Sequence, residues 1–257
     1  AGDLNGDLWV FDLSGNFTSL ASVTSTKLFT TEGNRPITTQ PNLAFHPSQP
    51  TTPSNAPNIM AYFGTGQFLV LDDKSDAAKL NKDYFYGVWD KTNANTSNGG
   101  VTPANLVEQT YSAANRVLSK LPVDYQNPAV YGWTIALDDP GERSITNSAV
   151  RGDVVFFNSS VPTNEPCATN GYGYTWAVDL ATGSSPDLPV LDTDDNGVLD
   201  GKDAADNGDV SGALHMDSFP TDNTFTDKVK FTGKDPLAIV QLTQPRLGRF
   251  SWQELLK

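Results

Sequence analysis

The chain has 257 residues, of which 38% are hydrophobic and 18% are charged, and its formal net charge is −13. This acidity argues against nucleic acid or an anionic bilayer as a partner, because both attract clusters of Lys and Arg. No apolar run approaches the roughly 20 residues that span a membrane as a helix. Gly (21 residues) and Pro (17 residues) are spread along the chain, which favours short strands joined by turns.

The chain begins at Ala1 inside a predicted strand, without an initiator Met or a signal peptide. We therefore expect a mature piece of a longer precursor, with strands of the first structural unit upstream of Ala1. Cys167 is the only cysteine, so the chain forms no internal disulfide. It is either a buried free thiol or half of a disulfide whose partner lies outside this chain.

Short aromatic and β-branched runs recur along the chain, and each contains a Trp followed by an Asp and a turn. These runs occupy residues 6–15, 84–93, 130–141 and 172–183. Further strands are predicted between them, and beyond the last, at 58–64, 68–72, 149–160 and 237–242. A recurring unit of roughly 40 to 50 residues with several strands is typical of β-propeller blades. The uneven spacing requires insertions in some blades, and a plain β-sandwich is the alternative.

The segment 102–122 is the one stretch that could form a helix. Thr102 could cap it and Pro103 could occupy its first turn, and good helix formers follow. Its apolar residues do not make a regular helical stripe, however. From the pattern alone, helix and strand remain equally open for this segment.

An acidic loop, DTDDNGVLDGKD, occupies residues 192–203. The loop of helix-loop-helix calcium proteins places ligands at positions one, three, five, seven, nine and twelve, with Gly at position six. Counted from the first Asp, Gly197 falls at position six. The six ligand positions fall on Asp192, Asp194, Asn196, the backbone carbonyl of Val198, Asp200 and Asp203.

Calcium binds six to eight oxygen ligands, which short Asp and Asn side chains on alternate residues can supply together. Asp203 stands where Glu is usual, so its shorter side chain makes its participation less certain than that of the other five. Asp195 lies off the pattern and is expected to face solvent. Because the following residues include Gly208 and Gly212, no exiting helix is expected, and the loop is predicted as an insertion between strands. The alternative is an ordinary solvated acidic turn.

Several longer motifs resemble one known family. The chain resembles the C-terminal domain of the type IV pilus tip-associated PilY family of adhesin and biogenesis proteins, from Ala1 nearly to Lys257. The motifs that carry this resemblance are, in order, AGDLNGDLWVFDLSG, AYFGTGQFL, YFYGVWD, LVEQT, RVLSKLPVDY, YGWTIALDDPGERSITNSAVRGDVVFFNSSVPTNEPC and GRFSWQELL. The acidic loop lies where that family carries its calcium site.

The resemblance implies an all-β, modified or incomplete β-propeller over residues 1–257 with an EF-hand-like calcium loop at 192–203. It implies a non-enzymatic role in pilus assembly, in calcium-dependent extension and retraction, and in surface adhesion. The implied location is extracellular, at the pilus tip on the cell surface, reached through the periplasm and outer membrane. The resemblance also favours strands over a helix for residues 106–121.

The implied partners are minor pilins or the pilus tip complex, a host or abiotic surface, and a separate N-terminal fragment of the same precursor. The family's variable N-terminal region and the first part of its propeller are not matched here. Adhesin activity that resides in that region is therefore not claimed for this chain.

Two other functions remain as alternatives: a quinoprotein-type propeller enzyme and a carbohydrate-binding propeller module. No nucleophile elbow, zinc-protease helix or phosphate loop occurs in the sequence. The only histidines, His46 and His215, are expected on the surface or in loops. Tyr84, Tyr86 and Trp89 could form a sugar-binding platform, although packing inside a blade is the simpler expectation. Residues 151–153 read Arg-Gly-Asp, which invites an integrin-binding interpretation but is better explained as a hairpin turn.

Overall fold

The computed structural model describes residues 1–12, 23–52, 57–74, 80–91, 100–112, 114–163, 171–204, 208–225, 229–231 and 236–239. These residues form strands and short 3-10 helices, without an α-helix among them. The all-β prediction is therefore confirmed. In the described ranges, no helix is long and apolar enough to cross a membrane.

The largest sheet has the strand order β3-β4-β5-β7-β6. Its strands are β3 (Asn42–Phe45), β4 (Ile59–Gly64), β5 (Asp83–Asp90), β7 (Gly132–Leu137) and β6 (Val107–Gln109). All neighbouring pairs are antiparallel except β6 and β7, which are parallel. The parallel strand belongs to segment 102–122, which therefore contributes a sheet edge and not an α-helix.

The second sheet has the order β11-β10-β9-β8, and two smaller sheets contain β1-β2 and β12-β13-β14. Its strands are β8 (Ala149–Arg151), β9 (Val154–Pro162), β10 (Gly171–Asp179) and β11 (Ala213–Met216). The smaller sheets comprise β1 (Asp7–Asp12), β2 (Thr24–Thr30), β12 (Thr224–Phe225), β13 (Val229–Phe231) and β14 (Pro236–Ile239).

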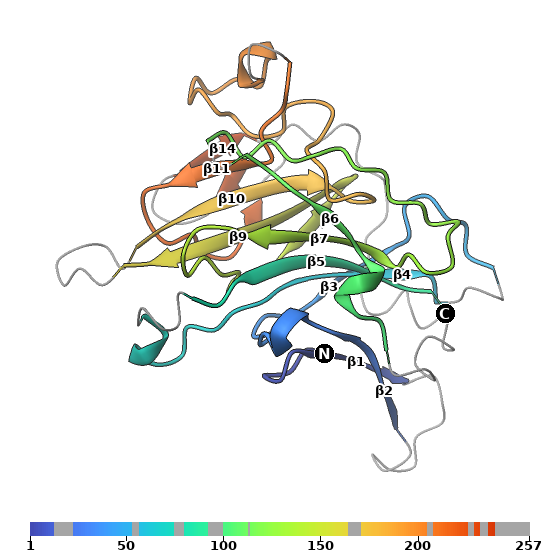
Figure 1. Cartoon of the computed structure of the whole chain (residues 1–257). Helices are drawn as coiled ribbons and strands as arrows, with labels where there is room; N and C mark the ends of the chain where they lie inside the picture. Colours follow the sequence, from blue (N-terminus) through green and yellow to red (C-terminus); the bar gives the residue numbers. More distant parts are fainter. Residues whose placement is uncertain are drawn as a thin grey trace.

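The sheets stack as successive layers (Figure 1). One apolar cluster joins the five-stranded and four-stranded sheets and includes Phe85, Trp133, Phe157 and Trp176. A second cluster, on the opposite face of the five-stranded sheet, joins it to β1 and β2 through residues such as Phe29. Three sheets in series depart from a plain two-sheet sandwich and resemble neighbouring propeller blades.

Aromatic rings set the spacing of the two large sheets. The Phe85 and Phe157 rings are stacked with centroids 3.7 Å apart, and Trp176 stacks on Phe157 at 5.3 Å. Trp133 is completely buried, and its indole N–H donates to the carbonyl of Leu180 at 3.2 Å. Burial of these large rings, rather than a continuous hydrogen-bonded sheet, is what holds the layers together.

Two glycines make room for the Trp133 indole. A Cβ at Gly87 would lie 2.5 Å from Trp133 Cε2, and one at Gly183 would lie 2.3 Å from Trp133 Cε3. Gly183 also has a φ of +70°, which favours glycine in its own right. The indole ring is thus enclosed by the backbone of β5 and by the turn that follows β10.

Most predicted strands are confirmed, with one clear error. Residues 68–72 form a bend leading into the 3-10 helix η3 (Leu71–Lys74), not a strand. The Asp73 carboxylate accepts the backbone N–H groups of Leu69 and Val70 at 2.7 Å and 2.9 Å. This local bonding replaces a sheet ladder. The predicted strand 237–242 is described only as far as Ile239, in β14.

His46 was expected on the surface or in a loop. It lies in the loop that follows β3, but its side chain is buried. Its ring centroid lies 4.4 Å from that of Trp89 and 4.3 Å from that of Tyr125. Its Nδ1 accepts the N–H groups of Ser48 and Gln49. Burial lowers the pKa of His46 to about 4, so the imidazole stays neutral at physiological pH. The other histidine, His215, is exposed as expected.

We expect Gly87→Ala to lower the free energy of unfolding by about 1–3 kcal/mol, because the new methyl group overlaps the Trp133 ring. The matched control is Gly201→Ala, where no atom lies within 4 Å of the added Cβ. Urea unfolding measures both variants. Equal stability of the two would show that the core accommodates the methyl group without strain.

We expect acid to destabilise the fold through His46. Its pKa is about 4 in the folded protein and about 6.5 when unfolded, so the unfolded state binds the proton first as the pH falls. The neutral ring contributes to the free energy of unfolding above pH 6.5, and this contribution is lost between pH 6.5 and 4. At pH 4.5 the free energy of unfolding is lower by roughly 2 kcal/mol for this reason. Urea unfolding at pH 7 and 4.5 should show this loss in wild type and in His215→Ala but a smaller loss in His46→Phe.

Candidate metal-binding loop

The acidic loop lies between β10 and β11 and projects beyond the four-stranded sheet as the orange segment at the top of Figure 1. Its first Asp follows Val190 and Leu191, which are buried against Phe156 and Ala177. It ends in the 3-10 helix η6 (Gly201–Asp203). The apolar pair fixes where the loop leaves the core, and the loop is confirmed as an insertion between strands.

The loop brings three carboxylates together. Asp192, Asp194 and Asp203 each offer an oxygen, and these three oxygens lie within 4.8 Å of one another. Asp192 and Asp203 are only 2% and 3% exposed, whereas Asp194 faces solvent. Among the residues that the structure describes, no Lys or Arg forms an ion pair with any of the three.

Backbone N–H groups orient the two buried carboxylates. Asp192 accepts from Asn196 at 3.2 Å and from Gly197 at 2.8 Å. Asp203 accepts from Thr193 at 2.7 Å and from Asp200 at 2.9 Å, so it ties the end of the loop to its start. These bonds partly offset the repulsion between the carboxylates but place no full positive charge among them.

The turn inside the loop has the backbone conformation that its glycine predicts. Gly197 has a φ of +82°, and Asp195 adopts a φ of +55°, which Asp tolerates better than most residues. Asp195 is exposed, as expected for a residue off the ligand pattern. The tight turn folds positions one to six back over the Asp192 carboxylate.

The other three predicted ligands have different surroundings. The Asn196 amide donates to Asp194 Oδ2 at 2.8 Å, and its oxygen accepts the N–H of Val198 at 2.7 Å. The Val198 side chain is exposed, in keeping with a role for its carbonyl only. Asp200 is not a member of the carboxylate group, and its Oδ1 accepts the N–H of Lys202 at 2.7 Å.

The donor set fits a hard divalent cation. Its three converging carboxylates are ligands that calcium prefers, and no His or Cys belongs to this group of described residues. Two buried anions without a neighbouring cation are costly, and a divalent ion would remove that cost. Asp203, the ligand about which the sequence was least decisive, is one of the two most buried members.

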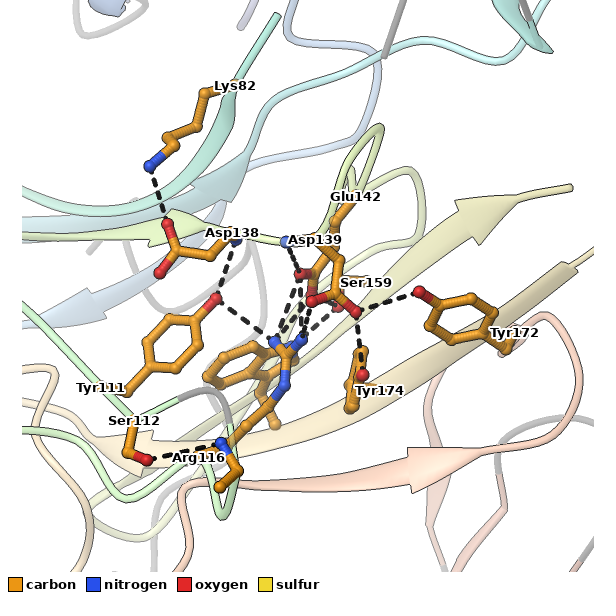
Figure 2. A network of polar contacts seen from close by, with 12 residues as sticks. Lys82, Tyr111, Ser112, Arg116, Asp138, Asp139, Glu142, Ser159, Tyr172 and Tyr174 are labelled. Carbon is orange, nitrogen blue, oxygen red and sulfur yellow. Dashed lines mark hydrogen bonds and ion pairs between the residues drawn. The ribbon is translucent and has the colours of Figure 1, made fainter. Parts of the chain in front are cut away.

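A second charged cluster, which the sequence did not reveal, surrounds Arg116 (Figure 2). The guanidinium group is 4% exposed and pairs with Glu142 at 3.1 Å and with Asp139 at 3.0 Å. Ser159 also donates to Glu142, and the indole of Trp176 donates to Ser159 at 2.9 Å. Burial raises the pKa of Glu142, and Arg116 opposes that shift.

Aromatic rings complete the enclosure of Arg116. Its guanidinium carbon lies 3.4 Å from the centroid of Tyr174, 5.0 Å from Trp176 and 5.1 Å from Tyr111. Arg116 itself has a φ of +49°, an unusual conformation for a residue other than Gly. We interpret the cluster as a structural anchor that ties the loop after β6 to the four-stranded sheet.

The remaining motifs have structural roles. Gly152 and Asp153 form the two-residue turn between β8 and β9, and Gly152 has the positive φ of +59° that such a turn requires. The hairpin interpretation of residues 151–153 is confirmed. Trp89 and Tyr86 are buried, and Tyr84 stacks on Tyr86, so they are no exposed sugar platform. Cys167 lies outside the described residues.

We expect Glu142→Gln to lower the free energy of unfolding by about 3–5 kcal/mol, because it leaves the buried Arg116 charge paired only with Asp139. Asp187→Asn is the matched control, since it breaks an ion pair with Lys120 in which both side chains are largely exposed. Guanidinium unfolding measures both. A loss in Glu142→Gln no larger than that in the control would contradict the anchoring role.

Curated relatives match the chain over almost its whole length. The "Type IV pilus biogenesis factor PilY1" of Pseudomonas aeruginosa (strain UCBPP-PA14) is 26% identical, and the match covers 98% of this chain and 26% of the relative. A PilY1 homolog of Xylella fastidiosa is also 26% identical, over 100% of this chain and 21% of the relative. The chain thus spans about a quarter of the length of these relatives. No family model matches the chain.

A solved structure has the same fold. The crystal structure of the P. aeruginosa PilY1 C-terminal domain superposes with a TM-score of 0.70 at 22% identity, covering 93% of this chain and 56% of that one. The stacked sheets are therefore a β-propeller-like fold, as predicted. Sequence and fold together confirm the resemblance to the PilY family and match the chain to its C-terminal domain.

Proposed function

We propose that this chain is the calcium-binding C-terminal propeller part of a type IV pilus biogenesis factor. Its relatives carry that name, and the match covers the part of the chain that contains the acidic loop. The observation that supports calcium most directly is the convergence of Asp192, Asp194 and Asp203. The proposed role is binding and switching at the pilus, without a catalytic step.

In this proposal Asp192 and Asp203 hold calcium at the base of the loop, and Asp194 and Asn196 close over it. The carbonyl of Val198 and the carboxylate of Asp200, directly or through water as is common at position nine, complete the ligand set. A bound ion converts mutual repulsion among the carboxylates into attraction toward one centre. Binding to the folded state alone stabilises it by roughly 2.7 kcal/mol at a hundredfold excess over Kd.

We further propose that upstream segments of the precursor complete the propeller. Among the described strands, β1 has only β2 as a sheet partner, while Ala1 bonds back to Trp9 at the start of β1. The solved domain that shares the fold is longer, since the match covers 56% of it. Residues 1–2 pair with Leu8 and Trp9, so the part of this edge that is suited to pairing with a further strand is the part of β1 after Trp9.

The proposed setting is the extracellular tip of the pilus, in contact with minor pilins or the pilus tip complex. There, calcium at the acidic loop would bias pilus extension against retraction, and the exposed propeller would meet a host or abiotic surface. Extracellular calcium modules commonly bind with dissociation constants of about 10⁻⁴–10⁻³ M, so a loop of this kind can respond to its surroundings. No observation favours the quinoprotein enzyme.

Calorimetric titration with calcium tests the loop. We expect heat of binding in wild type and in Asp195→Asn, whose carboxylate is exposed and off the pattern, but none in Asp192→Asn or Asp203→Asn. Asp200→Ala should weaken binding rather than abolish it, because its carboxylate lies outside the converging group. In calcium, addition of a chelator should lower the Tm of wild type and of Asp195→Asn but leave the Tm of Asp192→Asn and Asp203→Asn unchanged.

The outcome that would contradict the proposal is a wild-type chain without calcium heat, or an Asp203→Asn variant that binds as wild type does. To test the pilus role, Asp203→Asn and Asp195→Asn are each introduced into the full-length protein in its bacterial host. We expect Asp203→Asn to change surface piliation and twitching, and Asp195→Asn to leave both unchanged.

A further inference from the structure

A cavity of about 450 Å³ lies beside the acidic loop. Four segments line it: residues 114–117, the two ends of the acidic loop, residues 209–211, and β11 with its neighbour Tyr174 on β10. Its volume lies within the range of about 300–1,000 Å³ that is typical of small-molecule sites. It is separate from Tyr84 and Trp89, which are packed inside the sheets.

Tyr174 and His215 make one wall of this cavity aromatic, and Tyr172, which does not line the cavity, lies beside both rings. Tyr172 and Tyr174 both donate their hydroxyl groups to Asp139 Oδ2, at 3.1 Å and 2.9 Å, and the ring of His215 lies 5.4 Å and 5.3 Å from theirs (Figure 2 shows the two tyrosines). Because Asp139 is itself paired with Arg116, the two tyrosine rings are oriented before any ligand arrives. Fixed, half-exposed aromatic rings provide an amphipathic contact surface.

The other walls carry hydrogen-bonding groups and little positive charge. They include Asn115, Thr193, Asp203, Asp209 and Ser211. Among the residues that line the cavity, Arg116 is the one Lys or Arg, and its guanidinium is already paired with Glu142 and Asp139. An anionic ligand is therefore disfavoured, and a second cation would meet the guanidinium already stacked on Tyr174.

We propose that this cavity binds a saccharide. A sugar ring offers a face of C–H groups that suits the exposed His215 ring, which lies beside Tyr174, and hydroxyl groups that donate to carboxylates and amides and accept from hydroxyls. Asn115 and Asp209, which line the cavity, carry the amide and carboxylate groups that can bond to such hydroxyls. The ligand class is thus a neutral sugar of one to a few residues.

The saccharide site shares a wall with the proposed calcium loop, and in this respect it rests on the proposed function. Thr193 and Asp203 both line the cavity, and the Asp203 carboxylate accepts the N–H of Thr193 at 2.7 Å. Calcium at Asp203 would fix this wall, because a ligand that orders the loop lowers the ordering cost of the next one. Saccharide binding is therefore stronger with calcium than with a chelator.

The test begins with an array of neutral and acidic saccharides in millimolar calcium, and calorimetry follows on the best neutral sugar. We expect His215→Ala to weaken binding by roughly tenfold, since it removes one aromatic contact, and Asp209→Asn to weaken it as well. The matched controls are Lys120→Ala and Asp187→Asn, an exposed pair away from the cavity. Circular dichroism confirms that each variant is folded.

Three results would overturn the saccharide site: no neutral sugar bound while calcium heat is intact, binding unaffected by His215→Ala and Asp209→Asn, or displacement of the sugar by an oligolysine peptide. The first of these leaves the calcium loop standing, whereas loss of calcium heat in wild type refutes the loop. Equal sugar affinity with calcium and with chelator supports the cavity and overturns its link to the loop.

Discussion

The face-to-face packing of two sheets through large aromatic rings is the constraint on which the rest of this structure depends. Phe85, Phe157 and Trp176 form a continuous stack, and Trp133 lies beside it in the same cluster. Rings of this size bury 150–250 Å² each, so a few of them dominate the stability of the interface. The same packing imposes glycine at positions 87 and 183, because no Cβ fits against the indole of Trp133.

The stacked sheets also determine where the polar chemistry lies. Trp176 contributes to the core stack and, through its indole N–H, to the hydrogen bonds that hold Ser159 and Glu142. That chain of contacts ends at Arg116, which fixes the loop after β6. The acidic loop leaves the same sheet after β10. The loop after β6 and the acidic loop each form one wall of the cavity, so the aromatic core positions both walls.

The features that depend on neighbouring residues could be predicted from the sequence, whereas contacts between residues far apart in the chain could not. The strands around Trp89, Trp133 and Trp176 and the turn at Gly197 follow from neighbouring residues, as does the alternation of Asp192 and Asp194. Arg116, Asp139 and Glu142 meet across more than twenty positions of sequence, and nothing in their spacing announces the contact. Residues 68–72 were misread because the Asp73 carboxylate bonds their backbone locally in place of a strand ladder. His46 lies in a loop as expected, but its burial could not be foreseen because it depends on contacts with Trp89 and Tyr125.

The Arg116 cluster and the acidic loop show opposite solutions to one physical problem. Glu142 is buried and is matched by the Arg116 guanidinium, so its charge is balanced within the fold. Asp192 and Asp203 are buried as deeply, yet in the described structure the groups that reach them are backbone N–H groups and the Thr193 hydroxyl, none of which carries a full charge. Partial charges on amides do not balance two full negative charges, and this is the physical reason for proposing a cation site at the loop. In that proposal a divalent cation would supply the missing charge in one step, and its removal would loosen this segment without disturbing the core beneath it.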